Sequence, residues 1–128
     1  GTVAEMAQHM VEAMQQAFGS APKDLVAAIG PSIGPCCYEV DTPVIEKVKA
    51  LSYMPVEQVL HPVSEEKAML NLWELNRQIM IKAGIRPDHI TVAEVCTCCH
   101  HDLLFSHRAT KGRRGGLCAF MQITEEQA

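Results

Sequence analysis

The sequence lacks any apolar stretch long enough to cross a lipid bilayer. Its longest apolar runs, residues 25–29 and 79–81, are far shorter than the roughly 18 residues that a membrane-spanning helix needs. No basic segment followed by an apolar leader stands at the start of the sequence. We therefore expect no membrane partner.

An excess of positive charge is also missing. The chain carries 11 Lys and Arg residues against 15 Asp and Glu residues, for a formal net charge of −4. A surface that binds nucleic acid usually carries an excess of Lys and Arg, so we expect no nucleic-acid partner. The sequence has neither repeats nor low-complexity segments, and its 128 residues predict a single domain spanning residues 1–128.

Cysteine, by contrast, is frequent, with six in the chain. A chain of this length and apolar content can bury a core without disulfides, so cysteines here more often bind metal, react or pack. Because the cysteines look free and no leader is visible, we expect a cytoplasmic location.

The periodicity of apolar residues predicts a mixed order of helices and strands. Helices are predicted over residues 2–18, from Asp41 to about Ser52, and over a segment that includes Met69 and ends at Gly84. Strands are predicted at residues 25–29, 90–95 and 117–123, with a strand-like run at 103–108 and one brief strand around Val59. This order predicts an α/β domain with antiparallel pairing near its C-terminus, across the glycine turn at residues 111–116.

The loop at residues 30–38 is the first candidate site. Two Gly-Pro steps exclude a helix there and lead into Cys36 and Cys37. A thiol on a tight loop directly after a buried strand is held in place and stays accessible, as a metal ligand or a nucleophile requires. The alternative is that one of the two cysteines packs inward as a small apolar residue.

A second cluster, residues 96–101, holds Cys96, Cys98, Cys99, His100 and His101. Three cysteines within four residues cannot all bind one tetrahedral zinc, and no second Cys-x-x-Cys completes a zinc finger. A Cys-x-x-Cys redox pair normally begins a helix in a thioredoxin-like setting, which this sequence does not show. We therefore predict that most of these residues pack or end a strand.

A third feature is a basic stretch near the C-terminus. It contains Ser106, His107, Arg108, Lys111, Arg113 and Arg114 beside three glycines. Such a stretch can hold a phosphate or carboxylate, but a solvated hairpin tip explains the same residues.

Four segments together resemble the laccase-domain family, also called the multicopper polyphenol oxidase or purine nucleoside phosphorylase family. They are residues 28–40 (AIGPSIGPCCYEV), 70–77 (LNLWELNR), 96–97 (CT) and 105–108 (FSHR). The resemblance implies a four-layer α-β-β-α fold with mixed sheets and flanking helices. The family's usual length also implies that residues 1–128 are the C-terminal portion of a larger protein.

The resemblance implies enzymes that act on purine nucleosides with phosphate. The implied reactions are phosphorolysis of adenosine, inosine and methylthioadenosine, and deamination of adenosine. Alternatives are a copper-dependent polyphenol oxidase, a peptidoglycan-precursor editing hydrolase and a non-catalytic truncated module. The oxidase is chemically weaker, because multicopper enzymes need more histidines than the six present.

The family's metal site is implied to be a zinc ion held by two histidines and one cysteine, with copper as the alternative metal. The cysteine corresponds to Cys36, and one histidine belongs to a His-Ala-Gly-Trp-(Arg/Lys)-Gly-Thr motif, of which this chain keeps only the final Gly1-Thr2. The other histidine position is occupied by Tyr53, a poor ligand, so His61 is the candidate substitute. Cys36 and Arg108 are the predicted catalytic residues, with Arg108 contacting phosphate.

Overall fold

The computed structural model describes residues 2–113 and 115–123. Gly1 of the expected ligand motif and Arg114 of the basic stretch lie outside these residues. The helices are α1 (Met6–Phe18), α2 (Thr42–Lys49), α3 (Val56–Val59), α4 (Leu72–Lys82) and α5 (His107–Thr110), and short 3-10 turns cover Thr2–Ala4, Pro22–Asp24 and Pro87–His89. The strands are β1 (Ala27–Ile29), β2 (Glu39–Asp41), β3 (Leu60–Pro62), β4 (Lys67–Leu70) and β5 (Ile90–Val92).

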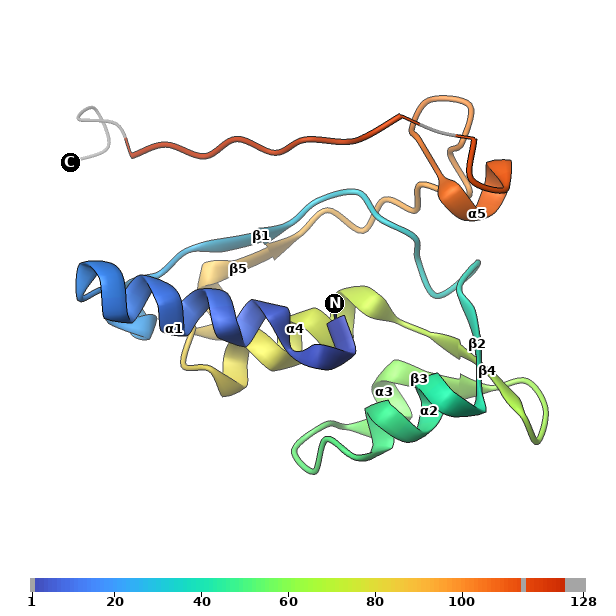
Figure 1. The fold of residues 1–128 in the computed structure, drawn as a ribbon, viewed down its shortest axis with the longest axis horizontal. Coiled ribbons are helices and arrows are strands. Elements are labelled where there is room, and N and C mark those ends of the chain that lie inside the picture. The colour runs from blue at the N-terminus through green and yellow to red at the C-terminus, as the bar shows by residue number, and fades with distance from the viewer. Residues whose placement is uncertain (1, 114, 124–128) are drawn as a thin grey trace.

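Two small sheets organise the molecule. Strands β1 and β5 pair in parallel, with Ala27 opposite Ile90 and Ile29 opposite Val92. Strands β2, β4 and β3 form an antiparallel sheet with β4 in the centre. Helices α1 and α4 pack against each other, and α2 and α3 lie beside the antiparallel sheet (Figure 1). The predicted α/β class, with mixed sheets and flanking helices, is confirmed.

The predicted helix that includes Met69 is wrong in its first part. Residues Lys67–Leu70 form β4, and the helix begins only after Asn71, whose side chain accepts a hydrogen bond from the Glu74 N–H at 3.1 Å. Alternating burial along β4 places Ala68 and Leu70 in the core. The apolar residues before Asn71 therefore belong to a strand that pairs with β2 on one side and β3 on the other. Local periodicity does not reveal such pairing.

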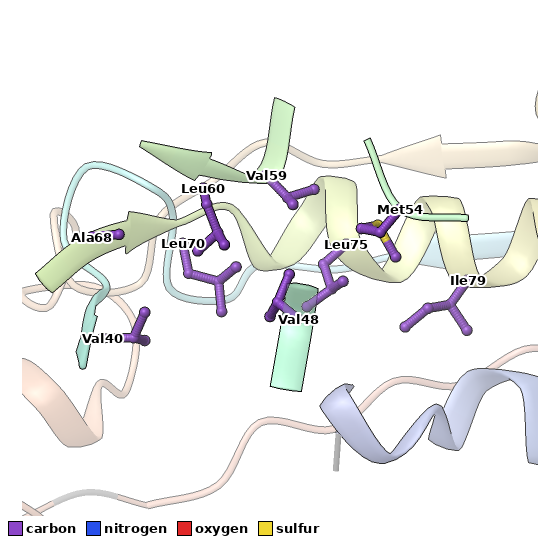
Figure 2. Close-up of a cluster of buried hydrophobic side chains, with 9 residues drawn as sticks. All are labelled: Val40, Val48, Met54, Val59, Leu60, Ala68, Leu70, Leu75 and Ile79. Atoms are coloured by element: carbon purple, nitrogen blue, oxygen red, sulfur yellow. The ribbon is translucent and has the colours of Figure 1, made fainter. Parts of the chain in front are cut away.

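The apolar core lies where the antiparallel sheet meets α2, α3 and α4. Nine buried side chains form it, drawn in Figure 2: Val40, Val48, Met54, Val59, Leu60, Ala68, Leu70, Leu75 and Ile79. Helix α4 contributes Leu75 and Ile79, one turn apart on the same face, and both are fully buried. This core contains no cysteine.

The two strands predicted near the C-terminus are wrong. Residues 117–123 form no strand with any described residue and run as an extended segment (Figure 1). Their apolar side chains are exposed, 95% for Phe120 and 96% for Ile123. The strand-like run before them ends instead in α5, which begins at His107 because the hydroxyl of its N-cap, Ser106, accepts the Ala109 N–H.

No described helix combines the length and the apolar content that a bilayer-spanning helix needs.

Candidate functional site

Two loops run side by side beyond the parallel strands, residues 30–38 after β1 and residues 93–99 after β5. We call them the paired loops. The Ser32 N–H donates to the Val95 carbonyl at 3.1 Å, and the Thr97 N–H donates to the Ser32 carbonyl at 3.2 Å. The pairing of β1 with β5 thus continues into the loops as single hydrogen bonds. It brings into contact two segments that lie more than sixty residues apart in the sequence.

Trp73 of α4 supports the first of these loops. Its indole N–H donates to the Ser32 hydroxyl at 2.9 Å. A Cβ added to Gly34 would lie 2.8 Å from the Trp73 ring and 3.2 Å from the Cys96 Cβ, so only glycine fits there without displacement. The Gly34 carbonyl accepts the N–H groups of Cys37 and Tyr38, both at 3.1 Å, which closes the turn that carries Cys36.

The paired loops gather four thiols, which we call the cysteine cluster. The ligand atoms of Cys36, Cys37, Cys96 and Cys99 all lie within 4.8 Å of one another. The Cys99 sulfur is 3.3 Å from that of Cys36 and 3.4 Å from that of Cys37. Cys96 is buried, whereas Cys36 and Cys99 are exposed.

The thiols of Cys36, Cys37 and Cys96 differ in acidity. Burial raises the pKa of Cys96, but hydrogen bonds from the N–H groups of Cys99 and Gly34 outweigh it, and the net pKa falls to about 6. The hydrogen bond with Cys99, followed by burial, raises the pKa of Cys36 to about 11 and also raises the pKa of Cys37. The geometry therefore favours a thiolate at Cys96 beside thiols at Cys36 and Cys37 that hold their protons more firmly.

The structure adds to the 96–101 cluster two cysteines that sequence spacing does not pair with it. Cys36 and Cys37 supply the two thiols that a second Cys-x-x-Cys would otherwise provide. Sequence spacing conceals this because the two halves are 62 to 63 residues apart. The one signal in the sequence is that each cysteine group follows a predicted strand, and parallel neighbours end at the same edge of a sheet.

A cleft of about 480 Å³ opens beside the paired loops. Its lining includes Ser32 and Tyr38 from the first loop, Thr97 from the second, and His107 and Arg108 from α5. The Arg108 guanidinium lies 5.2 Å from the centre of the Tyr38 ring and donates to the Glu39 carbonyl at 3.4 Å. The cleft thus combines an aromatic face, hydroxyl groups and a cation.

The other predicted metal ligands have different surroundings. His61 lies on β3, opposite Met69, and lines a separate cavity of about 470 Å³ together with Lys49 and Glu57. The Tyr53 hydroxyl donates to the Glu5 carboxylate at 2.7 Å, and burial together with this carboxylate raises the pKa of Tyr53. A metal shared by Cys36 and His61 stays a prediction.

The donor set around Cys36 differs from that of a catalytic zinc. A catalytic zinc usually has three protein ligands, often histidines, and an open position for water or substrate. Within the described residues, the potential ligand group that contains Cys36 consists of four thiols and no imidazole. This set fits a closed structural metal and does not fit the expected zinc with two histidines and one cysteine.

Comparison with known proteins shows one family over nearly the whole chain. A family model described as "Multi-copper polyphenol oxidoreductase laccase" matches residues 1–124. The purine nucleoside phosphorylase YlmD of Geobacillus stearothermophilus is 41% identical over 128 residues, which cover 98% of this chain and 46% of that protein. An adenosine deaminase, RL5, from an unknown prokaryotic organism is 32% identical over 108 residues, covering 84% of this chain and 41% of that protein.

Solved structures give the same result. The hypothetical protein YfiH of Bacillus licheniformis superposes with a TM-score of 0.85 at 40% identity, covering 90% of this chain and 43% of that one. The structure of YlmD from Geobacillus stearothermophilus gives a TM-score of 0.82 at 40% identity, with the same coverage. The chain therefore spans less than half the length of these relatives.

Proposed function

This chain belongs to the multi-copper polyphenol oxidoreductase laccase family, and we propose that the protein carrying it is a purine nucleoside phosphorylase that also deaminates adenosine. The proposed substrates are adenosine, inosine and methylthioadenosine, with inorganic phosphate as the second substrate. The chain contributes one wall of the substrate site, because it covers only part of each relative.

The cleft beside the paired loops carries this proposal. Most of its lining residues come from three of the segments that resemble the family, 28–40, 96–97 and 105–108, and Gly115 and Leu117 complete the lining. A purine offers a flat aromatic face and ring nitrogens, which suit the Tyr38 ring and nearby hydroxyls such as Ser32. Phosphate needs a cation, which Arg108 supplies at the same cleft.

In phosphorolysis, a phosphate oxygen bonds to the ribose C1′ while the bond from C1′ to the base nitrogen breaks. The base leaves with that electron pair and takes up a proton, so the products are a free purine and ribose 1-phosphate. Arg108 binds and orients the phosphate through its N–H groups. Its position over Tyr38 and its bond to the Glu39 carbonyl restrict the guanidinium before phosphate arrives.

Zinc is the proposed metal of the family reaction. A metal ion with an open position can lower the pKa of a bound water or polarise the substrate. Cys36 and His61 as ligands of one such ion stay a prediction of the resemblance alone, because the thiols around Cys36 do not fit that ion. The role assigned to Arg108 does not depend on it.

The test uses the full-length protein with adenosine or inosine, with and without phosphate, and follows base and nucleoside by chromatography. We expect phosphate-dependent release of hypoxanthine from inosine, and inosine formation from adenosine without phosphate. Arg108→Ala should lower kcat/KM for phosphorolysis by about 10- to 100-fold, mainly through the KM for phosphate.

Lys111→Ala is the matched control, because it removes a nearby cation that does not line the cleft. Equal losses in the two variants, or turnover of phenols under copper with no turnover of nucleosides, would contradict the proposed function.

A further inference from the structure

We propose that the cysteine cluster is a structural zinc site in which Cys36, Cys37, Cys96 and Cys99 bind one Zn²⁺ ion and crosslink the paired loops. This proposal stands apart from the proposed function, because it concerns an ion that holds the cleft wall and takes no part in the reaction. It gives Cys36 a structural role in place of the predicted catalytic one and of the predicted pairing with His61.

The spacing of the four sulfur atoms fits a tetrahedral ion. Zinc–thiolate bonds of about 2.3 Å place the sulfur atoms of a tetrahedral site about 3.8 Å apart. The cluster shows separations of 3.3 Å and 3.4 Å at Cys99, and all four ligand atoms lie within 4.8 Å of one another. Small rotations of the side chains are therefore enough to place an ion at equal distance from the four sulfurs.

The backbone around the cluster favours bound thiolates. The Gly34 N–H donates to the Cys96 sulfur at 3.2 Å, and the Cys99 N–H donates to the same sulfur at 3.4 Å. Four thiolates around one divalent ion leave an excess of negative charge, which N–H donors offset. Both donors come from the paired loops themselves, so the folded backbone prepares the site from each side.

The shared contact at Cys99 favours an ion over a disulfide. A disulfide joins two sulfur atoms at about 2.05 Å and would use either Cys36 or Cys37, but not both. Here both sulfur atoms approach Cys99 at nearly equal distances, and Cys96 lies within the same group. A tetrahedral ion, by contrast, uses all four thiols at once.

The proposed ion would control the shape of the cleft. Each loop gives two ligands, Cys36 and Cys37 from one and Cys96 and Cys99 from the other. The same loops place Ser32, Tyr38 and Thr97 on the cleft wall. Loss of zinc should therefore loosen this wall while the apolar core stays folded, because the core contains no cysteine.

The first test measures zinc in the purified full-length protein by elemental mass spectrometry. Cys37→Ser and Cys99→Ser should each reduce zinc by about one ion per chain relative to the wild type. Cys98→Ser is the matched control, since Cys98 stands between two proposed ligands but outside the cluster, and it should keep the wild-type zinc content. Equal zinc contents in all four proteins would overturn the proposal.

The second test does not depend on variants that fold. Replacement of zinc by Co²⁺ in the wild type should give the strong absorption of tetrahedral cobalt with thiolate ligands, and Zn²⁺ should displace it. Denaturation without reductant should release the six cysteines of residues 1–128 as free thiols. A disulfide between cluster cysteines in freshly isolated protein, or iron or copper in place of zinc, would overturn the assignment.

Discussion

The apolar core and the paired loops of this molecule are held together by different interactions. In the apolar core, nine buried side chains pack between the antiparallel sheet and three helices. In the paired loops, the contacts are single backbone hydrogen bonds, one indole–hydroxyl bond and four thiols. The core is stabilised by the removal of apolar surface from water, whereas the loops depend on polar contacts and on the proposed ion.

The two regions therefore have different roles. The apolar core determines whether the chain stays folded, and the paired loops determine where the site residues lie. Burial of Leu70, Leu75 and Ile79 can keep the chain folded without fixing the positions of Ser32 or Tyr38. The loops, in turn, bury little apolar surface of their own. We therefore expect substitutions in the two regions to have separable effects on unfolding and on metal binding.

The largest effect should come from the core. Leu75 is 0% exposed, so Leu75→Ala leaves a cavity and should lower the free energy of unfolding by about 3 kcal/mol. Zinc content per folded chain should stay at the wild-type value. Urea unfolding followed by circular dichroism measures the loss, and Phe18→Ala, at a side chain that is 79% exposed, is the control. A zinc loss in Leu75→Ala would show that the two regions are not separable.

A smaller effect is expected where α4 meets the first loop. Gly34→Ala brings a Cβ to 2.8 Å from the Trp73 ring, which should cost about 2 kcal/mol and weaken zinc binding, because the Gly34 N–H donates to Cys96. Gly30→Ala is the control, since nothing lies within 4 Å of a Cβ there. Unfolding curves measure the change in the free energy of unfolding, and competition with a chelator measures the change in zinc affinity. Unchanged zinc affinity in Gly34→Ala would argue against a role for this loop geometry in metal binding.

The smallest effect concerns the single indole–hydroxyl bond. Trp73→Phe removes the 2.9 Å bond to Ser32 and should cost about 1 kcal/mol. Combined with Ser32→Ala in a double-mutant cycle, the loss should be less than additive, because each single variant already breaks the bond. Additive losses would mean that the bond contributes nothing to stability.

The sequence predicted much of the fold and less of the site. Local periodicity predicts helix α1 and strand β5, and Gly19 accounts for the end of α1. The Gly-Pro steps predict the loop after β1. Strand β4 does not, since its apolar residues also suit a helix and its identity depends on pairing with β2 and β3. The strand predicted at residues 117–123 is wrong for a related reason, because β-branched and apolar composition cannot supply a partner strand.

For the site, the sequence identified Cys36 and Arg108 as notable but paired Cys36 with His61. Neighbours in space depend on which strands lie side by side, and the parallel pairing of β1 with β5 brings Cys96 and Cys99 to Cys36. Arg108 was predicted to contact phosphate within a strand-like run. It instead belongs to the short helix α5, which places its guanidinium over Tyr38.

The central claim is that four particular thiols share one ion. Site-resolved alkylation of the native full-length protein, read by peptide mass spectrometry, tests it most directly. With zinc bound, Cys36, Cys37, Cys96 and Cys99 should be protected together although Cys36 and Cys99 are exposed, while Cys98 and the exposed Cys118 react. After chelation the protection of the four should disappear together. Reaction of Cys36 and Cys99 at the rate of Cys118, unchanged by chelation, would contradict the account.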